Sequence, residues 1–81
     1  MSEFVFETIE VGAVFGKNKI KPKWFLRGGS KHDIKEISYM WRSREGDAVI
    51  VHFTVSDGAN IFEISFNQKS MAWTLDGVDH Q

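Results

Sequence analysis

Four lysines recur at every second position in the first third of the chain, and their type and spacing suggest chemistry. They are Lys17, Lys19, Lys21 and Lys23. Side chains at alternate positions of an extended strand point to the same side, so the four ammonium groups would form a row with about 7 Å between neighbours. Such a row of positive charge suits the regularly spaced phosphates of a nucleic-acid strand.

Aromatic and further basic residues follow these lysines directly. Residues 11–31 contain six basic residues and no acidic one, whereas the rest of the chain has 4 basic against 11 acidic residues. Proteins that bind single strands combine positive charge for the backbone with aromatic rings for the bases. We therefore expect a surface for nucleic acid or another polyanion, formed by Lys17, Lys19, Lys21, Lys23, Trp24, Arg27 and Lys31.

The same segment also has a purely structural explanation. Lysines are common on edge strands, where they prevent two sheets from joining edge to edge. Pro22 indicates an edge strand or a loop, because proline cannot donate a ladder hydrogen bond. In this explanation Trp24 and Phe25 belong to the core.

His52 and Glu63 form the most enzyme-like combination. The strand register derived below places them opposite each other, with Ser38 beside His52 and Thr74 beside Glu63. Serine, histidine and glutamate in a row resemble a nucleophile, a base and an orienting group. A flat sheet face makes a poor pocket, however, and the sequence has no G-x-S-x-G motif. We therefore expect an ordinary cross-strand polar pair and no enzyme.

The sequence offers no metal or cofactor site. His32, His52 and His80 are dispersed, and neither H-E-x-x-H nor H-x-x-E-H occurs. The absence of cysteine excludes disulfides, thiolate zinc sites and iron–sulfur clusters. It also favours a reducing compartment, since small secreted domains commonly depend on disulfides.

The elements that must position these residues are strands, because apolar and polar residues alternate and no helical period is sustained. Three turn signals divide the C-terminal half: Asp57-Gly58, a three-residue loop at 44–46, and a turn at 67–70. They predict a four-stranded antiparallel meander from about residue 32 to residue 75.

The predicted turns also fix a register between the strands. The pairs include Phe53 with Phe62, Trp41 with Val49 and Phe66 with Met71. In this register one apolar face collects Ile37, Tyr39, Trp41, Val49, Val51, Phe53, Phe62, Ile64, Phe66, Met71, Trp73 and Leu75. Because a slip of one residue would scatter these side chains over both faces, the pattern supports the meander.

The opposite face of the meander is mixed. It is predicted to carry Met40, Ile50, Ile61, His52 and Glu63. A half-solvated sheet face has this composition. The alternative function is therefore a protein–protein interaction or homodimerisation module that uses this mixed face.

A single sheet cannot cover its own apolar face, so the first 30 residues must do so. The available apolar residues are Phe4, Phe6, Val11, Val14, Phe15, Ile20, Trp24, Phe25 and Leu26. We expect one all-β domain over residues 1–81, a small barrel or roll in which N-terminal strands cover the meander. A short helix within the first 20 residues is the alternative.

The chain is expected to be soluble and cytoplasmic, with no membrane partner. Its start is acidic, unlike a signal peptide. No apolar stretch approaches the roughly 20 residues that a membrane-spanning helix needs. The leading prediction is thus a non-enzymatic module that binds nucleic acid or another polyanion.

Two aromatic blocks carry a resemblance to a known kind of domain. They are the residues 24–28, Trp-Phe-Leu-Arg-Gly, continued by Ile34, Ile37 and Trp41, and the closing segments 62–66 and 73–75. This spacing resembles small uncharacterised bacterial domains with an F-x-W-x-G-R-x-Y-x-V block and a closing Y-x-L-x-F…W-x-L pattern. Leu26 stands where those domains have tryptophan. The resemblance implies a small β-rich fold and no particular activity.

Overall fold

The computed structural model describes residues 2–80, and these form seven β-strands and no helix. The strands are β1 (Ser2–Gly16), β2 (Lys19–Arg27), β3 (Ser30–Asp33), β4 (Glu36–Glu45), β5 (Ala48–Ser56), β6 (Asn60–Asn67) and β7 (Ala72–His80). The all-β prediction is confirmed, and no helix occurs in the described part of the first 20 residues. Accordingly, the described residues contain no helix that is long and apolar enough to cross a membrane.

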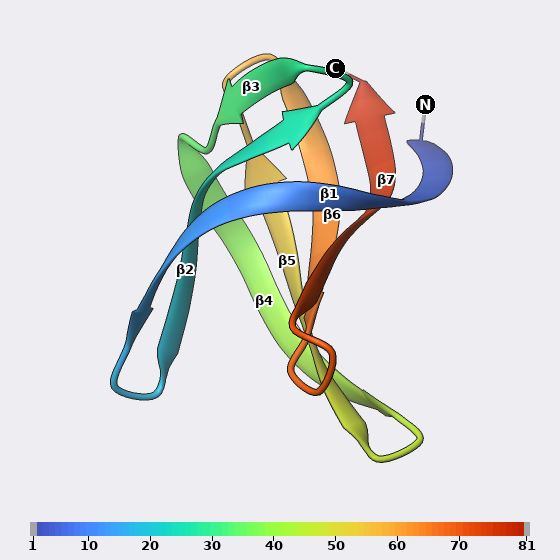
Figure 1. Cartoon of the computed structure of the whole chain (residues 1–81). Helices are drawn as coiled ribbons and strands as arrows, with labels where there is room; N and C mark the ends of the chain where they lie inside the picture. The colour runs from blue at the N-terminus through green and yellow to red at the C-terminus, as the bar shows by residue number, and fades with distance from the viewer. Residues whose placement is uncertain (1, 81) are drawn as a thin grey trace.

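All seven strands belong to one antiparallel sheet in the order β3-β2-β1-β7-β6-β5-β4 (Figure 1). The predicted meander is present as β4 to β7. β1 joins it to the N-terminal hairpin, because its first half pairs with β7 and its second half with β2. The long β1 therefore crosses the whole molecule (Figure 1).

The sheet is curled into a half-barrel because its two edge strands are joined by only two residues. β3 ends at Asp33 and β4 begins at Glu36, although these strands lie at opposite ends of the strand order. The amide of Ile34 donates to the carbonyl of Lys23, and the amide of Lys35 donates to the carbonyl of Ser56, both at 2.8 Å. A flat sheet could not satisfy both bonds, so the connection forces the curl.

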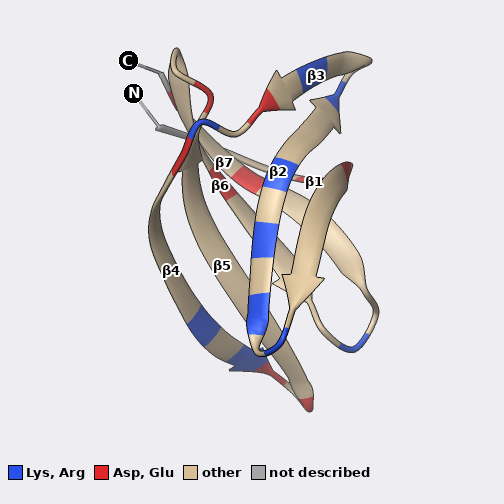
Figure 2. Cartoon of the chain, turned by 90° about the vertical axis from the view of Figure 1, so that its left-hand side faces the viewer, with Lys and Arg blue, Asp and Glu red and all other residues tan. Residues whose placement is uncertain are grey.

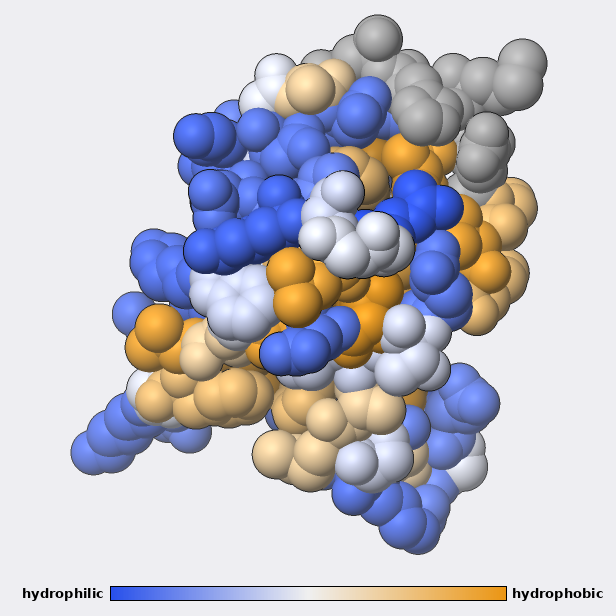
Figure 3. Space-filling model, turned by 45° about the horizontal axis from the view of Figure 1, so that its top comes forward, coloured by the Kyte–Doolittle hydropathy of each residue, from blue (hydrophilic) through white to orange (hydrophobic). Residues whose placement is uncertain are grey.

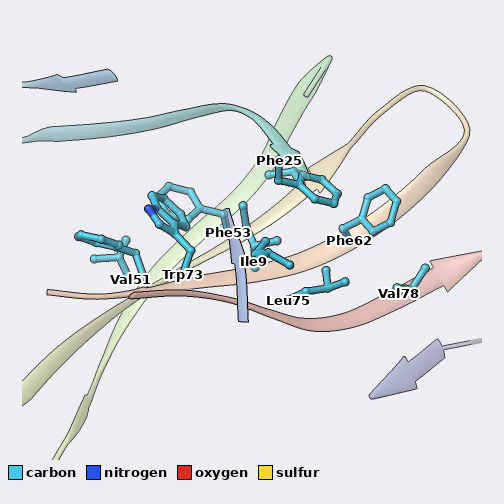
Figure 4. Packing of buried hydrophobic residues seen from close by; sticks show 11 residues of the cluster. Ile9, Phe25, Val51, Phe53, Phe62, Trp73, Leu75 and Val78 are labelled. Carbon is cyan, nitrogen blue, oxygen red and sulfur yellow. The ribbon is translucent and has the colours of Figure 1, made fainter. Parts of the chain in front are cut away.

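The core fills the inner face of this half-barrel (Figure 4). β5 to β7 supply most of it, and Ile9 from β1 and Phe25 from β2 complete it. Full burial of each large apolar side chain contributes about 1.5–3 kcal/mol. The buried cluster consists of Ile9, Phe25, Val51, Phe53, Val55, Phe62, Ile64, Phe66, Trp73, Leu75 and Val78.

The prediction that N-terminal strands cover the meander is confirmed, but not by all the residues expected to do so. Phe4, Phe6, Val14 and Phe15 are each more than half exposed. Phe25 is fully buried and packs edge-on against Phe62, with ring centroids 4.9 Å apart. The exposed aromatic residues are therefore available for other contacts.

The predicted registers of two hairpins are wrong by two residues. Phe53 pairs with Ile64 rather than with Phe62, and Phe66 pairs with Trp73 rather than with Met71. The turn between β5 and β6 is two residues longer than expected, and the turn between β6 and β7 has the expected length but begins one residue later. An Asx side chain organises each turn. The carboxylate of Asp57 accepts the amides of Ala59 and Asn60 at 2.8 Å, and the amide oxygen of Asn67 accepts the amides of Lys69 and Ser70. A shift of two leaves the paired side chains on their predicted faces.

The prediction that Met71 lies on the apolar face is wrong, because Met71 lies in the turn with a φ of 64° and is 63% exposed. Beyond an irregularity between Glu63 and Ile64 the offset becomes three, and Phe62 pairs with Val78.

The predicted register between β4 and β5 is wrong by three residues over most of its length, and a shift by an odd number moves side chains to the opposite face. Trp41 pairs with His52, and Met40 pairs with Phe53. The turn is shorter than the predicted three-residue loop, since Glu45 already pairs with Ala48. As a result Tyr39 and Trp41 lie on the outer face instead of the apolar face. Met40 lies on the inner side of this edge strand and not on the mixed face. An irregularity between Ile37 and Tyr39 returns Ile37 to the inner face, opposite Val55.

Candidate binding surfaces

The predicted basic surface is built on the hairpin of β1 and β2 (Figure 2). Lys17 lies in the turn, and Lys19, Lys21 and Lys23 lie on β2; all four are exposed. Lys19 and Lys21 occupy strand positions two apart and share a side. Lys23 falls at an irregularity, because Gly12 pairs with Trp24 whereas the next residue of β1 pairs with Pro22. The row is therefore less regular than the sequence alternation predicts.

Residues 19–22 of β2 also form a free edge, whereas the carbonyl of Lys23 accepts the amide of Ile34. β3 pairs only with Trp24–Arg27, so none of the described strands pairs with β2 beside the lysines. The four lysines also make no ion pair with any described residue. The segment around Pro22 is thus an edge strand, as predicted, which fits both explanations of the lysines.

The other three residues predicted for the basic surface already have partners. Arg27 forms an ion pair with Glu7 through Nε and Oε1 at 3.0 Å. Lys31 lies 3.7 Å from a carboxylate oxygen of Asp33 and 5.3 Å from the centre of the Trp24 ring. Trp24 is half-buried. The structure therefore separates four available lysines from three residues used within the fold.

Two arginines that the sequence analysis did not assign to the surface lie on the other edge strand. Arg42 and Arg44, exposed near the end of β4, pair with Val51 and Val49. Figure 2 shows their basic segment of β4 and the lysines of β2 on the same side of the molecule. The alternation of basic residues in Arg42-Ser43-Arg44 could have indicated this second basic segment, but the sequence analysis placed Arg44 in a turn.

A second surface is a hollow of about 720 Å³ on the outer face, opposite the core. β4 to β7 and the beginning of β1 form it. The residues that line it are Phe4, Phe6, Trp41, Glu45, Ile50, His52, Glu63, Ser65, Asn67, Thr74, Asp76, Gly77, Val78 and Asp79. This volume is within the usual range of small-molecule sites.

Aromatic residues form the rim of the hollow. Phe4 and Phe6 stack with an interplanar angle of 4°, and they are 83% and 69% exposed. Phe6 has a positive φ of 51°, at the irregularity of β1 between Phe4 and Glu7. On the other side Trp41 stacks on His52, with ring centroids 4.6 Å apart and an interplanar angle of 5°. The positive φ of Phe6 is a strained conformation for a phenylalanine, and such strain is retained where the surrounding structure enforces it. Exposed apolar residues interrupt the hydrophilic surface where the molecule is viewed from its upper end (Figure 3).

Carboxylates and hydroxyls form the floor. The hydroxyl of Thr54 donates to both carboxylate oxygens of Glu63, at 3.0 and 2.9 Å. The hydroxyl of Ser65 donates to Asp76 at 3.2 Å. Burial raises the pKa of Asp76 above its usual value, and the Ser65 hydrogen bond and nearby His52 offset part of this effect. The hollow thus contains a carboxylate that gains from a positive partner.

The predicted His52–Glu63 pair is not formed, because of the register shift. His52 pairs with Ser65, and Glu63 pairs with Thr54. The Nε2 atom of His52 lies 2.7 Å from the hydroxyl of Ser43, whereas Ser38 donates to the carbonyl of Thr54. The predicted row of serine, histidine and glutamate is therefore absent.

The predicted mixed face is only partly assembled. Ile50, Ile61, His52 and Glu63 share the outer face, but Met40 lies on the other side. Ile50 is 7% exposed, so it contributes little to an interface. A protein partner or second copy on this face stays a prediction. The described residues include no group of three or more His, Asp or Glu side chains that could hold a metal ion.

Comparisons with protein-family models, with curated proteins and with solved structures find no match for this chain. The resemblance to small bacterial β-rich domains therefore stays a prediction from the sequence.

Proposed function

We propose that this protein is a non-enzymatic binding module that contacts single-stranded nucleic acid or another polyanion through Lys17, Lys19, Lys21 and Lys23. The observation that carries this proposal is the exposed, unpaired state of these four lysines on one hairpin. Cations that already pair with carboxylates release little free energy on meeting a phosphate, whereas unpaired ones keep their full attraction.

The arrangement of charge supports the proposal further. Arg42 and Arg44 add positive charge on the same side of the molecule (Figure 2). Protection of an edge strand alone needs few charges, since a single inward or edge-facing lysine can block strand pairing. Four lysines on one hairpin exceed this need. In a chain whose net charge is −1, a local concentration of cations favours a specific anionic partner over general solubility.

The proposal assigns binding to charge and not to base stacking. Trp24 is the aromatic residue nearest to the lysines, but it is half-buried and contacts Lys31. We therefore expect little sequence preference and a strong dependence on salt.

The test is fluorescence anisotropy with a labelled single-stranded oligonucleotide at low salt, repeated with DNA, RNA and heparin as a competitor. If four lysines contact phosphates, the logarithm of the binding constant should fall against the logarithm of salt with a slope of about −3. The double variant Lys19→Glu/Lys21→Glu should abolish binding.

The matched control is Lys35→Glu/Lys69→Glu, which changes the net charge equally but lies outside the hairpin. It should keep most of the affinity. Equal losses in both double variants, or no binding of any polyanion by the unaltered chain at low salt, would contradict the proposal.

A further inference from the structure

We infer that the outer hollow between Trp41 and the Phe4–Phe6 pair is a binding site for a guanidinium cation. This site is independent of the proposed polyanion surface, because none of Lys17, Lys19, Lys21 and Lys23 lines the hollow. The inference combines the volume of the hollow, the aromatic rim and the charge of the floor.

The charge of the floor selects a cation. Glu45, Glu63 and Asp76 line the hollow, and His52 is the one basic side chain among the described lining residues. Ionisation of the half-buried Asp76 is costly, although the Ser65 hydroxyl and His52 offset part of this cost. A cation in the hollow would remove this cost, so charge complementarity favours it over a neutral or anionic ligand.

The rim selects an organic cation with a flat face. Positively charged groups over aromatic rings are attracted by the ring quadrupole. Phe4 and Phe6 are stacked and more than two-thirds exposed, although such exposure of two phenylalanines costs free energy in the unbound protein. Trp41 is held in place by its stacking on His52. A guanidinium plane can cover one of these rings while its edge reaches the carboxylates, and the Phe4–Phe6 pair is the closer one, since Phe4 and Glu63 both pair with Gly77.

Guanidinium fits this combination better than the other cations. It is planar, is weakly hydrated and donates to carboxylates through two parallel N–H groups, whereas an ammonium is strongly hydrated. A metal ion needs several ligands converging on one point, and no such group occurs among the described residues. Glu63 and Asp76 are therefore the expected partners of the guanidinium, with Phe4 and Phe6 as the stacking surface, because Trp41 already contacts His52 and Tyr39.

Two sources can carry the guanidinium group, and the experiment separates them. Two-dimensional ¹H–¹⁵N NMR of the full chain is recorded during titration with agmatine, a free guanidinium compound, and with acetyl-Gly-Arg-Gly-amide. We expect shifts confined to residues that line the hollow. Binding of agmatine alone indicates a small-molecule ligand, and binding of the peptide indicates an arginine of a protein partner; either result supports the site.

The ligand control replaces arginine with citrulline, which has nearly the same shape but no charge. The citrulline peptide should bind at least about tenfold more weakly, since hydrogen bonds to charged groups are the stronger ones. Equal binding of the two peptides, shifts spread outside the hollow, or no saturable shift with either cation would overturn the inference.

The protein variants are Asp76→Asn and Phe4→Ala. Each should weaken binding of the cation by about tenfold or more. The matched controls are Glu36→Gln, an exposed carboxylate outside the hollow, and Phe15→Ala, an exposed aromatic residue outside it. The controls should bind as the unaltered chain does. The same spectra report whether each variant is folded, and loss of affinity in the controls equal to that in the variants would also overturn the inference.

Discussion

The imidazole Nδ1 of His32 lies 3.1 Å from the Oδ2 of Asp57, and this contact joins β3 to the turn between β5 and β6. The His32 ring also stacks on Phe25, with centroids 4.9 Å apart, and meets the edge of Phe62. Because β3 is the last strand at one end of the sheet, the contact helps to hold the half-barrel in its curled form. His32 therefore has a structural role.

The contact gives a prediction for the stability of the fold in acid. Burial acts to raise the pKa of Asp57, but hydrogen bonds from the amides of Asn60 and Ala59 and from His32 outweigh it, so its pKa is below the usual 3.8. A carboxyl whose pKa is lowered by folding stabilises the fold above the pKa of the unfolded chain. This contribution should be lost as the pH falls from about 4 through the lower pKa of the folded state.

Asp57→Asn should therefore reduce the free energy of unfolding at neutral pH by on the order of 1 kcal/mol. It should also flatten the loss of stability below pH 4. Urea unfolding between pH 2 and pH 7 measures both effects. Asp33→Asn removes an exposed carboxylate from β3 and serves as the control. If the free energy of unfolding of Asp57→Asn falls below pH 4 as steeply as that of the unaltered chain, the contact does not contribute to stability.

Gly12 gives a prediction about packing between β1 and β2. A Cβ atom at this position would lie 2.1 Å from the nearest ring atom of Trp24. The indole would have to move, which would disturb its contact with Lys31. We expect Gly12→Ala to destabilise the fold by about 1–3 kcal/mol, measured by urea unfolding.

Gly16 is the matched control, since a Cβ atom there would meet nothing within 4 Å. Gly16→Ala should change the stability by less than about 0.5 kcal/mol. In the Gly12→Ala background, Trp24→Leu should recover part of the loss. Equal stability of the two alanine variants would contradict this packing.

Asp76 gives a prediction of the opposite sign to Asp57. Burial raises its pKa in the folded state, so ionisation of Asp76 destabilises the fold at neutral pH. This penalty should disappear as the pH falls through the raised pKa. Asp76→Asn should therefore be more stable than the unaltered chain near pH 7, and the difference should shrink in acid.

The measurement is thermal unfolding of both proteins between pH 4 and pH 7, with NMR titration of the Asp76 carboxyl. Ser65→Ala removes a hydrogen bond that lowers this pKa. It should raise the pKa of Asp76 further. A lower stability of Asp76→Asn at neutral pH would mean that the ionised carboxylate stabilises the fold.

The strands and the apolar faces of β5 to β7 could be predicted from the sequence because both depend on local properties. Alternation identifies a strand and its buried side, and residues such as Gly58 with φ of 97° mark the turns. The exact register could not be predicted. Registers that differ by two residues place the same side chains on the same face, so Phe53 satisfies the pattern opposite either Phe62 or Ile64.

The odd shift of β4 had a different cause and changed the candidate sites. The length of the turn after Glu45 decides which face Trp41 occupies, and alternation in β4 is compatible with either face. The structure places Trp41 on the outer face, where it stacks on His52. The shift of β4 also placed Ser43 instead of Ser38 beside His52 and contributed one wall of the hollow, whereas the shift of two between β5 and β6 separated His52 from Glu63.

By itself, the sequence determined the all-β fold and the cluster of lysines in residues 17–23, because alternation and charge are properties of neighbouring residues. Only the tertiary structure decided which of the predicted basic residues remain available, because Arg27 and Lys31 find their partners through folding. The outer hollow also depends on tertiary structure, since its walls come from β1, β4 and β7. Pairing of β1 with β7 and of β4 with β5 places these segments, which are distant in the sequence, on one sheet, and no local sequence pattern specifies that pairing.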